Sequence, residues 1–165
     1  MYTNIMVPLD GSKLAECVLP DVEGFIAECR VKSIVLVRVV EPAPMKFDDT
    51  AAISATSREL LVENIRRIEE KRQSAALEYL NSVERRLKQE GVKISAEVLV
   101  GGVAESLADY TETKGIDLII IATHGRSGIS RWVRGSIADR VLRFSPVPVL
   151  MVRATGSMSQ PTLLV

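Results

Sequence analysis

The chain has 165 residues, of which 47% are hydrophobic and 25% are charged, and its formal net charge is zero. This composition favours one globular domain with a full-sized core, and it excludes a disordered chain and a strongly basic surface for DNA or RNA. The first residues carry no basic region followed by a long apolar stretch, and no apolar run approaches the roughly 20 residues that span a bilayer. We therefore expect a cytoplasmic protein whose partners include neither nucleic acid nor membrane.

Short apolar runs rich in β-branched residues alternate along the chain with segments of helical periodicity. The expected strands are Asn4–Pro8, Ser33–Val40, Lys93–Val100, residues 117–122 and residues 147–152. The expected helices are residues 12–29, with a kink at Pro20, and residues 57–90, 104–113 and 136–144. A long surface loop is expected over residues 41–56. The alternation predicts an α/β fold with a doubly wound, five-stranded parallel sheet and helices on both faces.

The domain is expected to end near residue 153, with residues 154–165 as a flexible C-terminal tail. Within it the second helix is the longest, and an apolar stripe runs along it before Gly91 ends it. The stripe consists of Leu61, Ile65, Ile68, Ala76, Leu80, Val83 and Leu87. At about 1.5 Å per residue such a helix exceeds the length of the strands, so its first turns should overhang the sheet or break.

The two cysteines, Cys17 and Cys29, fall on one expected helix. Twelve steps of about 1.5 Å separate them by roughly 18 Å, which is too far for a disulfide. No second histidine or cysteine cluster accompanies them, so we interpret both thiols as core filler.

A glycine-rich loop is the strongest functional signal in the chain. The strand that ends at Ala122 runs into Thr123-His-Gly125-Arg-Ser-Gly128, and Gly135-Ser136 then opens the last helix. Glycines let the backbone approach a ligand with amide hydrogens pointing inward, and a helix N-terminus attracts anions. Arg126, Arg131 and Arg134 form the only positive cluster beside this loop. The pattern predicts a cradle for one small phosphate-bearing ligand.

The turn after the first strand offers a second candidate. Leu9-Asp10-Gly-Ser12 places a carboxylate at the carboxyl end of that strand, where it could bond a ligand hydroxyl or help to order a metal on a phosphate. The alternative is a purely local role, since Asp-Gly-Ser at such a turn is what helix capping selects. Because ligands of doubly wound sheets bind beyond the carboxyl ends of the strands, this turn and the glycine loop should be neighbours.

Catalytic signals are weak. His124 is the only histidine, and Ser127 lacks both an orienting base and a nucleophile-elbow pattern. Neither Gly-x4-Gly-Lys-Ser/Thr nor a Gly-x-Gly-x-x-Gly after the first strand occurs. We therefore assign no catalytic residue and no metal ligand, and we expect slow ATP hydrolysis at most.

These residues resemble the universal stress protein family, whose ATP-binding members carry Gly-x2-Gly-x9-Gly-Ser/Thr after the fourth strand. This chain has Ala122-x2-Gly125-x9-Gly135-Ser136, with alanine in place of the first glycine. The resemblance runs from about Asn4 to Arg153. It includes the start Ile5-Met-Val-Pro8-Leu-Asp10, the turn Gly101-x-Val-Ala-Glu105 and the close Pro146-Val-Pro-Val-Leu-Met-Val-Arg153.

The resemblance implies a strand order of 3-2-1-4-5 and an adenine nucleotide, either ATP or AMP or ADP, with Mg²⁺ as a possible companion. It places Pro8, Asp10 and the backbone of Val39 around the adenosine. It places the glycine loop and the following helix start around the phosphates. The full set of expected contact residues is Pro8, Leu9, Asp10, Val39, Ala122, Gly125, Arg126, Gly128, Gly135, Ser136 and Ile137.

The resemblance also implies a homodimer formed by antiparallel pairing of the last strand, from Val147 to Val152. Pro148 cannot donate a ladder hydrogen bond, so the pairing should centre on Leu150. The leading function is a nucleotide-binding stress-response regulator read by an unknown signalling partner. Two alternatives stay open, a slow ATPase or nucleotidyl-transfer enzyme and a nucleotide-free dimerisation module, the latter supported by Ala122.

Overall fold

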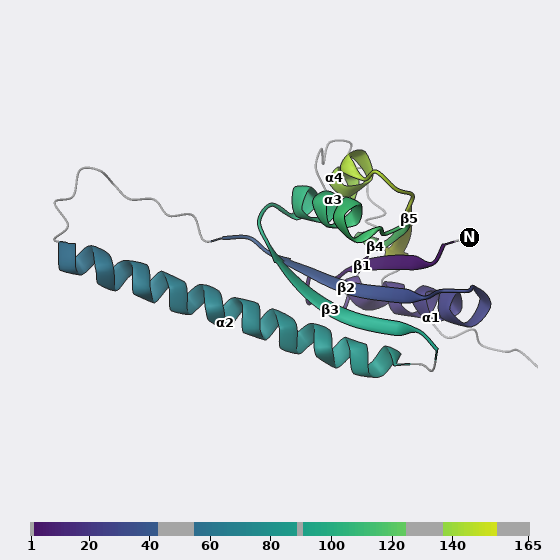
Figure 1. Cartoon of the computed structure of the whole chain (residues 1–165), viewed down its shortest axis with the longest axis horizontal. Coiled ribbons are helices and arrows are strands. Elements are labelled where there is room, and N and C mark those ends of the chain that lie inside the picture. Colours follow the sequence, from purple (N-terminus) through teal and green to yellow (C-terminus); the bar gives the residue numbers. More distant parts are fainter. Residues whose placement is uncertain (1, 43–54, 89–90, 125–136, 155–165) are drawn as a thin grey trace, which may run out of the picture.

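The computed structural model describes residues 2–42, 55–88, 91–124 and 137–154. These residues form a five-stranded sheet in the order β3-β2-β1-β4-β5, and every pairing is parallel. The elements are β1 Asn4–Pro8, the 3₁₀ helix η1 Ala15–Val18, α1 Leu19–Glu28, β2 Ser33–Val40, α2 Ala55–Leu87, β3 Lys93–Val100, α3 Val103–Lys114, β4 Leu118–His124, α4 Ile137–Phe144 and β5 Val149–Ala154. The predicted fold class and strand order are confirmed, with β1 between β2 and β4 (Figure 1).

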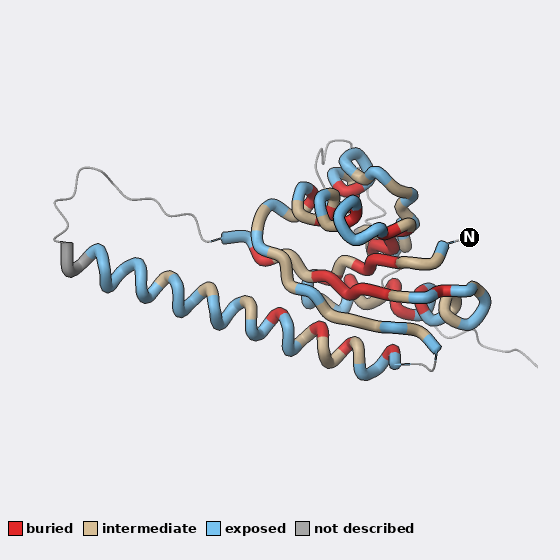
Figure 2. Tube along the Cα trace, viewed as in Figure 1, coloured by how far each residue is buried: buried red, intermediate tan, exposed pale blue. Residues whose placement is uncertain are grey.

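Two hydrophobic clusters lie on opposite faces of the sheet because successive strand residues point to opposite faces. In β1, Ile5 and Val7 join one cluster while Met6 joins the other. The first cluster is covered by η1, α1 and α2, and the second by α3 and α4 (Figure 1). Figure 2 shows buried residues concentrated in the central strands. Burial on both faces explains why these strands are apolar runs and do not alternate with polar residues.

The first helical segment differs from the prediction of one kinked helix. Residues Ala15–Val18 form a 3₁₀ turn, and an α-helix follows over Leu19–Glu28, so Pro20 stands in the first turn of α1. A proline there is harmless, because its missing N–H would have no partner within the helix. Pro20 therefore marks a helix start. Cys17 and Cys29 are free thiols that pack, half-buried, against the core, as expected of filler.

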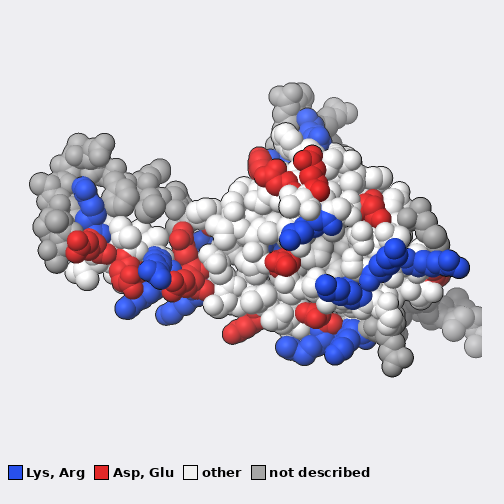
Figure 3. Space-filling model, in the orientation of Figure 1, with Lys and Arg blue, Asp and Glu red and all other residues white. Residues whose placement is uncertain are grey.

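Helix α2 spans 33 residues and is therefore about 50 Å long. Only its C-terminal half packs into the core, through Ala76, Leu80, Val83 and Leu87. Upstream, Leu60 and Ile68 are 62% and 55% exposed, and the first turns extend beyond the sheet as predicted (Figure 1). On the face shown in Figure 3, positive and negative side chains are interleaved along this overhang. The exposed i,i+4 pairs Arg66–Glu70 at 2.9 Å and Arg67–Glu63 at 3.4 Å belong to this part of α2 and favour the helical conformation there.

Several boundaries shift by a few residues. Helix α2 begins at Ala55, two residues inside the loop predicted over 41–56, and it ends at Leu87, before the predicted 90. Strand β4 continues to His124 and β5 starts at Val149, since the parallel ladder between them pairs Ile119 with Val149 through His124 with Ala154. Residues 43–54 of the predicted loop, Ser136 and the predicted tail after Ala154 lie outside the described residues.

The amino-terminal edge of the sheet is held by Asp117. Its carboxylate accepts hydrogen bonds from the Thr3 amide at 2.8 Å, the Thr3 hydroxyl at 2.9 Å and the Asn4 amide at 3.0 Å. The Asn4 side chain in turn accepts from Ser33 and donates to the carbonyl of Gly115, whose left-handed φ of 63° ends α3. This network ties β1 to β2 and β4 at the amino-terminal ends of the strands.

Candidate functional site

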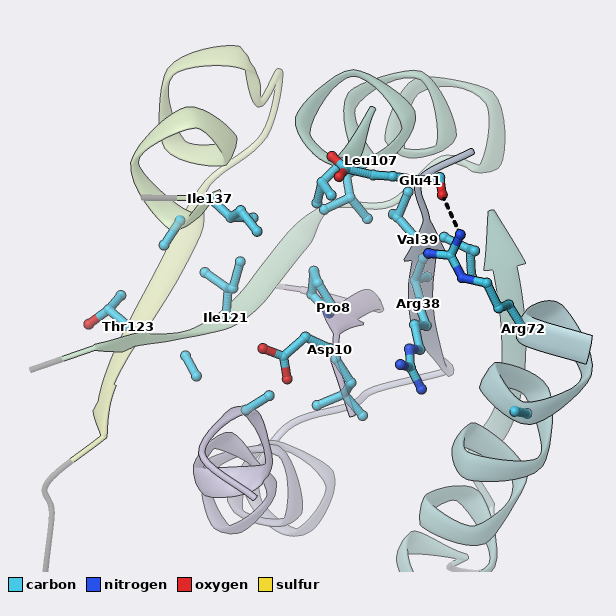
Figure 4. Close-up of a pocket in the computed structure, with 18 residues that line it drawn as sticks. Pro8, Asp10, Arg38, Val39, Glu41, Arg72, Leu107, Ile121, Thr123 and Ile137 are labelled. Carbon is cyan, nitrogen blue, oxygen red and sulfur yellow. Dashed lines mark hydrogen bonds between the residues drawn. The ribbon is translucent and has the colours of Figure 1, made fainter. Parts of the chain in front are cut away.

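A cavity of about 600 Å³ opens at the carboxyl ends of β1, β2 and β4. Its volume lies within the range of small-molecule sites. The connections of the sheet run from β1 toward β3 on one side and from β4 to β5 on the other, so the strand order reverses between β1 and β4. Doubly wound sheets bind ligands at this point. Helices α2, α3 and α4 complete the wall (Figure 4).

The predicted contact residues that the structure describes all line this one cavity. They are Pro8, Leu9, Asp10, Val39, Ala122 and Ile137. The remaining predicted contacts, Gly125, Arg126, Gly128, Gly135 and Ser136, lie outside the described residues, and so do Arg131 and Arg134. The fold thus brings residues from four separate segments to one place.

The two carboxylate oxygens of Asp10 have different surroundings. One carboxylate oxygen, Oδ1, accepts a hydrogen bond from the Ser12 amide at 2.8 Å, and the Ser12 hydroxyl accepts one from the Ala15 amide at 3.0 Å. Both bonds are local and order the turn between β1 and η1, while Leu14, the residue that precedes η1, makes no side-chain cap. Figure 4 shows the Asp10 carboxylate pointing into the cavity, where its second oxygen can accept a hydrogen bond from a ligand.

The turn after β1 is closed by Gly11, which has a φ of +91° that a side chain would strain. A Cβ at this position would also lie 2.9 Å from Nη1 of Arg38. The guanidinium of Arg38, which comes from β2, therefore packs directly against the turn that presents Asp10.

Two cations of the cavity were missed by the sequence analysis, which placed positive charge only at Arg126, Arg131 and Arg134. Arg38 and Arg72 both line the cavity from β2 and α2. Arg72 donates from Nη1 to the carbonyl oxygen of Glu41 at 3.1 Å, just beyond the end of β2 (Figure 4). A signal for Arg38 was present, because it is the one charged residue within the apolar run Ser33–Val40.

The ring of Tyr79, on α2, packs against the guanidinium of Arg38. The guanidinium carbon lies 5.6 Å from the centre of the Tyr79 ring, within reach of a cation–π contact. The Tyr79 hydroxyl donates to Glu16 at 3.2 Å, and Glu16 also accepts from Arg86 at 2.8 Å. Burial raises the pKa of the Tyr79 hydroxyl, and the carboxylates of Glu16 and Asp10 raise it further while Arg38 opposes them. The phenol therefore stays a protonated donor at physiological pH.

Ala122, the residue that replaces a glycine of the family motif, lies in regular strand geometry. It pairs with Val152 in the β4–β5 ladder, and its half-buried methyl packs on the cluster covered by η1 and α1. Alanine is strained only where φ must be positive, so the backbone here tolerates it.

The amino end of α4 also borders the cavity, through Ile137 and Ala138. The first amides of a helix lack intrahelical partners and carry the positive end of its dipole, so this end favours an anionic ligand. In the part of the chain described, no group of three or more His, Cys, Asp or Glu side chains is placed to hold a metal ion. Within the same residues, no helix is both long and apolar enough to cross a membrane.

Comparisons with known proteins identify the family and support the fold. The model of the universal stress protein family matches residues 1–153. Universal stress protein MJ0577 of Methanocaldococcus jannaschii is 26% identical over 160 residues, which cover 95% of this chain and 98% of that protein. The solved structure of MJ0577 has a TM-score of 0.72, covering 95% of this chain and 99% of that one.

Two further solved structures contain nucleotides. A universal stress protein in complex with cAMP has a TM-score of 0.60 at 18% identity and covers 93% of this chain and 98% of its own. An Arabidopsis thaliana family member with AMP bound has a TM-score of 0.59 at 12% identity, with 97% of each chain covered. At these identities the likeness concerns the fold. Because the family model matches residues 1–153, nearly the whole chain, this chain belongs to the universal stress protein family.

Proposed function

We propose that this chain is a cytoplasmic stress-response regulator that binds an adenine nucleotide in the cavity at the carboxyl ends of β1, β2 and β4. The observation that carries the proposal is the convergence of Pro8, Asp10, Val39, Ala122 and Ile137 on one cavity of about 600 Å³. Members of the same family and fold have been solved with cAMP and with AMP bound, which supports an adenine nucleotide as the ligand class.

In the proposed mode, Pro8, Leu9 and the backbone of Val39 contact the adenosine, and the free oxygen of Asp10 accepts from a ribose hydroxyl. The 5′-phosphates lie toward β4 and α4, where the helix amides at Ile137 favour negative charge. The family resemblance adds Gly125, Arg126, Gly128, Gly135 and Ser136 to the phosphate contacts. AMP, ADP and ATP all satisfy this arrangement, the last with or without Mg²⁺.

The site suits binding and signalling better than turnover. Phosphoryl transfer requires charge neutralisation and a positioned base or nucleophile. Among the described lining residues the only carboxylates are Asp10 and Glu41, and one oxygen of Asp10 is already bonded to the Ser12 amide. We therefore expect no phosphate release from ATP above a buffer blank. Release that Asp10→Asn abolishes would favour the enzyme alternative.

Ala122 favours one competing function, a nucleotide-free dimerisation module. Ala122 lines the cavity at the position where, by the family resemblance, ATP-binding members carry glycine. Mass spectrometry of the protein precipitated after purification separates the two functions, because a binding protein should release a copurified adenine nucleotide. If none is found, nucleotide binding is measured for both the native chain and the Ala122→Gly variant. A nucleotide that only this variant binds assigns the native chain to the nucleotide-free members.

A further inference from the structure

We infer that the β2–α2 end of the cavity is a second anion subsite, built from Arg38 and Arg72, and that the ligand is an adenine nucleotide phosphorylated on its ribose as well as at the 5′ position. The inference rests on the proposed function, because it takes the adenosine to lie against Asp10. It goes beyond that function in naming a second phosphate and the residues that recognise it.

Arg38 is a cation with no counter-ion among the described residues. It forms no ion pair with any carboxylate there, and its guanidinium lies over the ring of Tyr79. A half-buried charge in a cavity wall without a counter-ion costs free energy unless solvent or a ligand anion compensates it. A ligand anion would compensate it directly.

The guanidinium of Arg38 is also held in place before any ligand arrives. Tyr79 supports it from one side, and the hydroxyl of Tyr79 is fixed by Glu16, which Arg86 fixes in turn. The turn at Gly11 closes the other side, because even a methyl group there would touch the guanidinium. A fixed cation loses little conformational entropy when it binds an anion, which favours affinity.

Arg72 supplies the second cation of this end. One of its N–H groups is bound to the Glu41 carbonyl, which fixes the guanidinium beside the end of β2 at the cavity wall. The remaining donors of the planar fork are suited to phosphate oxygens. Two carboxylates, Asp10 and Glu41, also line the cavity, and that of Asp10 points toward β4, away from Arg38 (Figure 4). A phosphate at the β2–α2 end therefore uses the positive charge of both arginines.

The position of the subsite identifies where on the nucleotide the extra phosphate must be. The 5′-phosphates are assigned to the β4 and α4 side, whereas Arg38 and Arg72 come from β2 and α2 across the cavity. Arg38 packs on the turn that presents Asp10, the residue proposed to contact the ribose. In dinucleotide-binding sheets an arginine beside the ribose accommodates a 2′-phosphate by the same chemistry.

Calorimetric titration tests the inference with AMP, adenosine 2′,5′-bisphosphate and adenosine 3′,5′-bisphosphate. The native chain should bind at least one bisphosphate about tenfold or more tightly than AMP, since a charge-assisted contact of this kind contributes about that factor. Arg38→Gln should abolish the preference and leave AMP affinity within about twofold. Arg67→Gln is the matched control, because Arg67 is an exposed arginine of the same helix as Arg72 and lines no part of the cavity.

Tyr79→Leu gives a second variant in case Arg38→Gln does not fold, and it should weaken the preference by releasing the guanidinium. Equal affinity for AMP and both bisphosphates in the native chain overturns the second subsite and leaves the proposed function intact. A preference that survives Arg38→Gln also overturns it. If no nucleotide binds, both the subsite and the proposed function fail.

Discussion

At the scale of single residues, the two ends of the sheet use aspartate for different purposes. Both carboxylate oxygens of Asp117 accept hydrogen bonds, three in all, from Thr3 and Asn4 at the amino-terminal ends of the strands. Asp10, at the carboxyl-terminal edge, uses one oxygen on its own turn and presents the other to the cavity. Saturated hydrogen bonding indicates a structural residue, and a spare acceptor in a cavity indicates a binding residue.

Asp117→Ala should destabilise the fold by about 2 to 3 kcal/mol, because it leaves the Thr3 and Asn4 donors without a charged acceptor. Asp117→Asn keeps one oxygen and should lose about half as much. Urea unfolding measures both losses. Nucleotide affinity of the folded variants should equal that of the native chain, and a weakened affinity would contradict the structural role.

The tyrosines give a prediction for alkaline pH. Burial raises the pKa of Tyr79 and, to a smaller extent, that of Tyr110, which Glu97 raises further. A phenol whose pKa is raised by folding contributes stability that is present below its ordinary pKa of about 10 and is lost as the pH rises through the folded pKa. Tyrosinate absorbance of the native chain should therefore lag behind that of the unfolded chain above about pH 10. Coincident titrations would show that neither hydroxyl is shielded.

Sequence reasoning reached some site residues and missed others for identifiable reasons. Pro8 and Asp10 were predictable because they end an apolar strand, and the ends of parallel strands share one edge. Arg38 was signalled by a charge inside such a run, but its direction depends on the Tyr79 ring from a distant helix. Arg72 gives no local signal, since only the packing of α2 on the sheet brings it to the cavity.

At the scale of elements, helix α2 has two halves with different energetics. The apolar stripe continues through both, yet only the C-terminal half meets the sheet. Length arithmetic predicted the overhang, because strands of five to eight residues cannot cover a helix of 33. The 3₁₀ turn before α1 was not predictable in the same way, since Pro20 is compatible with a kink and with a helix start alike.

Two leucines of α2 test this division. Leu80 is fully buried and Leu61 is 41% exposed. Leu80→Ala should therefore cost about 2 to 5 kcal/mol of unfolding free energy, and Leu61→Ala within about 0.5 kcal/mol. Denaturant titrations of the two variants give the comparison. A loss at Leu61 as large as that at Leu80 would mean that the overhang is packed against a surface in solution.

At the scale of the whole molecule, β5 ends the sheet, and among the described residues no strand pairs with its outer side. Leu150 and Met151 on that strand are 36% and 40% exposed, and soluble proteins usually pair or cover such an edge. Pro148 lies just outside the strand, so it interrupts no ladder bond within Val149–Ala154. These features support the proposed homodimer, which resemblance to the family suggested.

Sedimentation at micromolar concentration should accordingly give twice the 18.1 kDa mass of the chain. Leu150→Lys should return it to the mass of one chain, because a charge at the centre of the paired edge opposes association. Leu60→Lys, at a leucine 62% exposed on the overhang of α2, is the control and should stay dimeric. A native chain that sediments as a monomer would contradict the proposed homodimer.

Thermal unfolding with and without an adenine nucleotide tests the central claim most directly. At about one hundred times its dissociation constant, AMP or ATP with Mg²⁺ should stabilise the native chain by roughly 2.7 kcal/mol and raise the melting temperature by a few degrees. Asp10→Asn keeps the acceptor for the Ser12 amide but loses the charge facing the cavity, so it should weaken binding about tenfold. Asp109→Asn, at an exposed residue outside the cavity, is the control and should leave nucleotide affinity unchanged. The central claim is contradicted if the native chain shows no shift with any of these nucleotides. A shift that appears only in Ala122→Gly then makes the native chain a nucleotide-free member, and no shift in either chain means that the cavity binds none of these nucleotides.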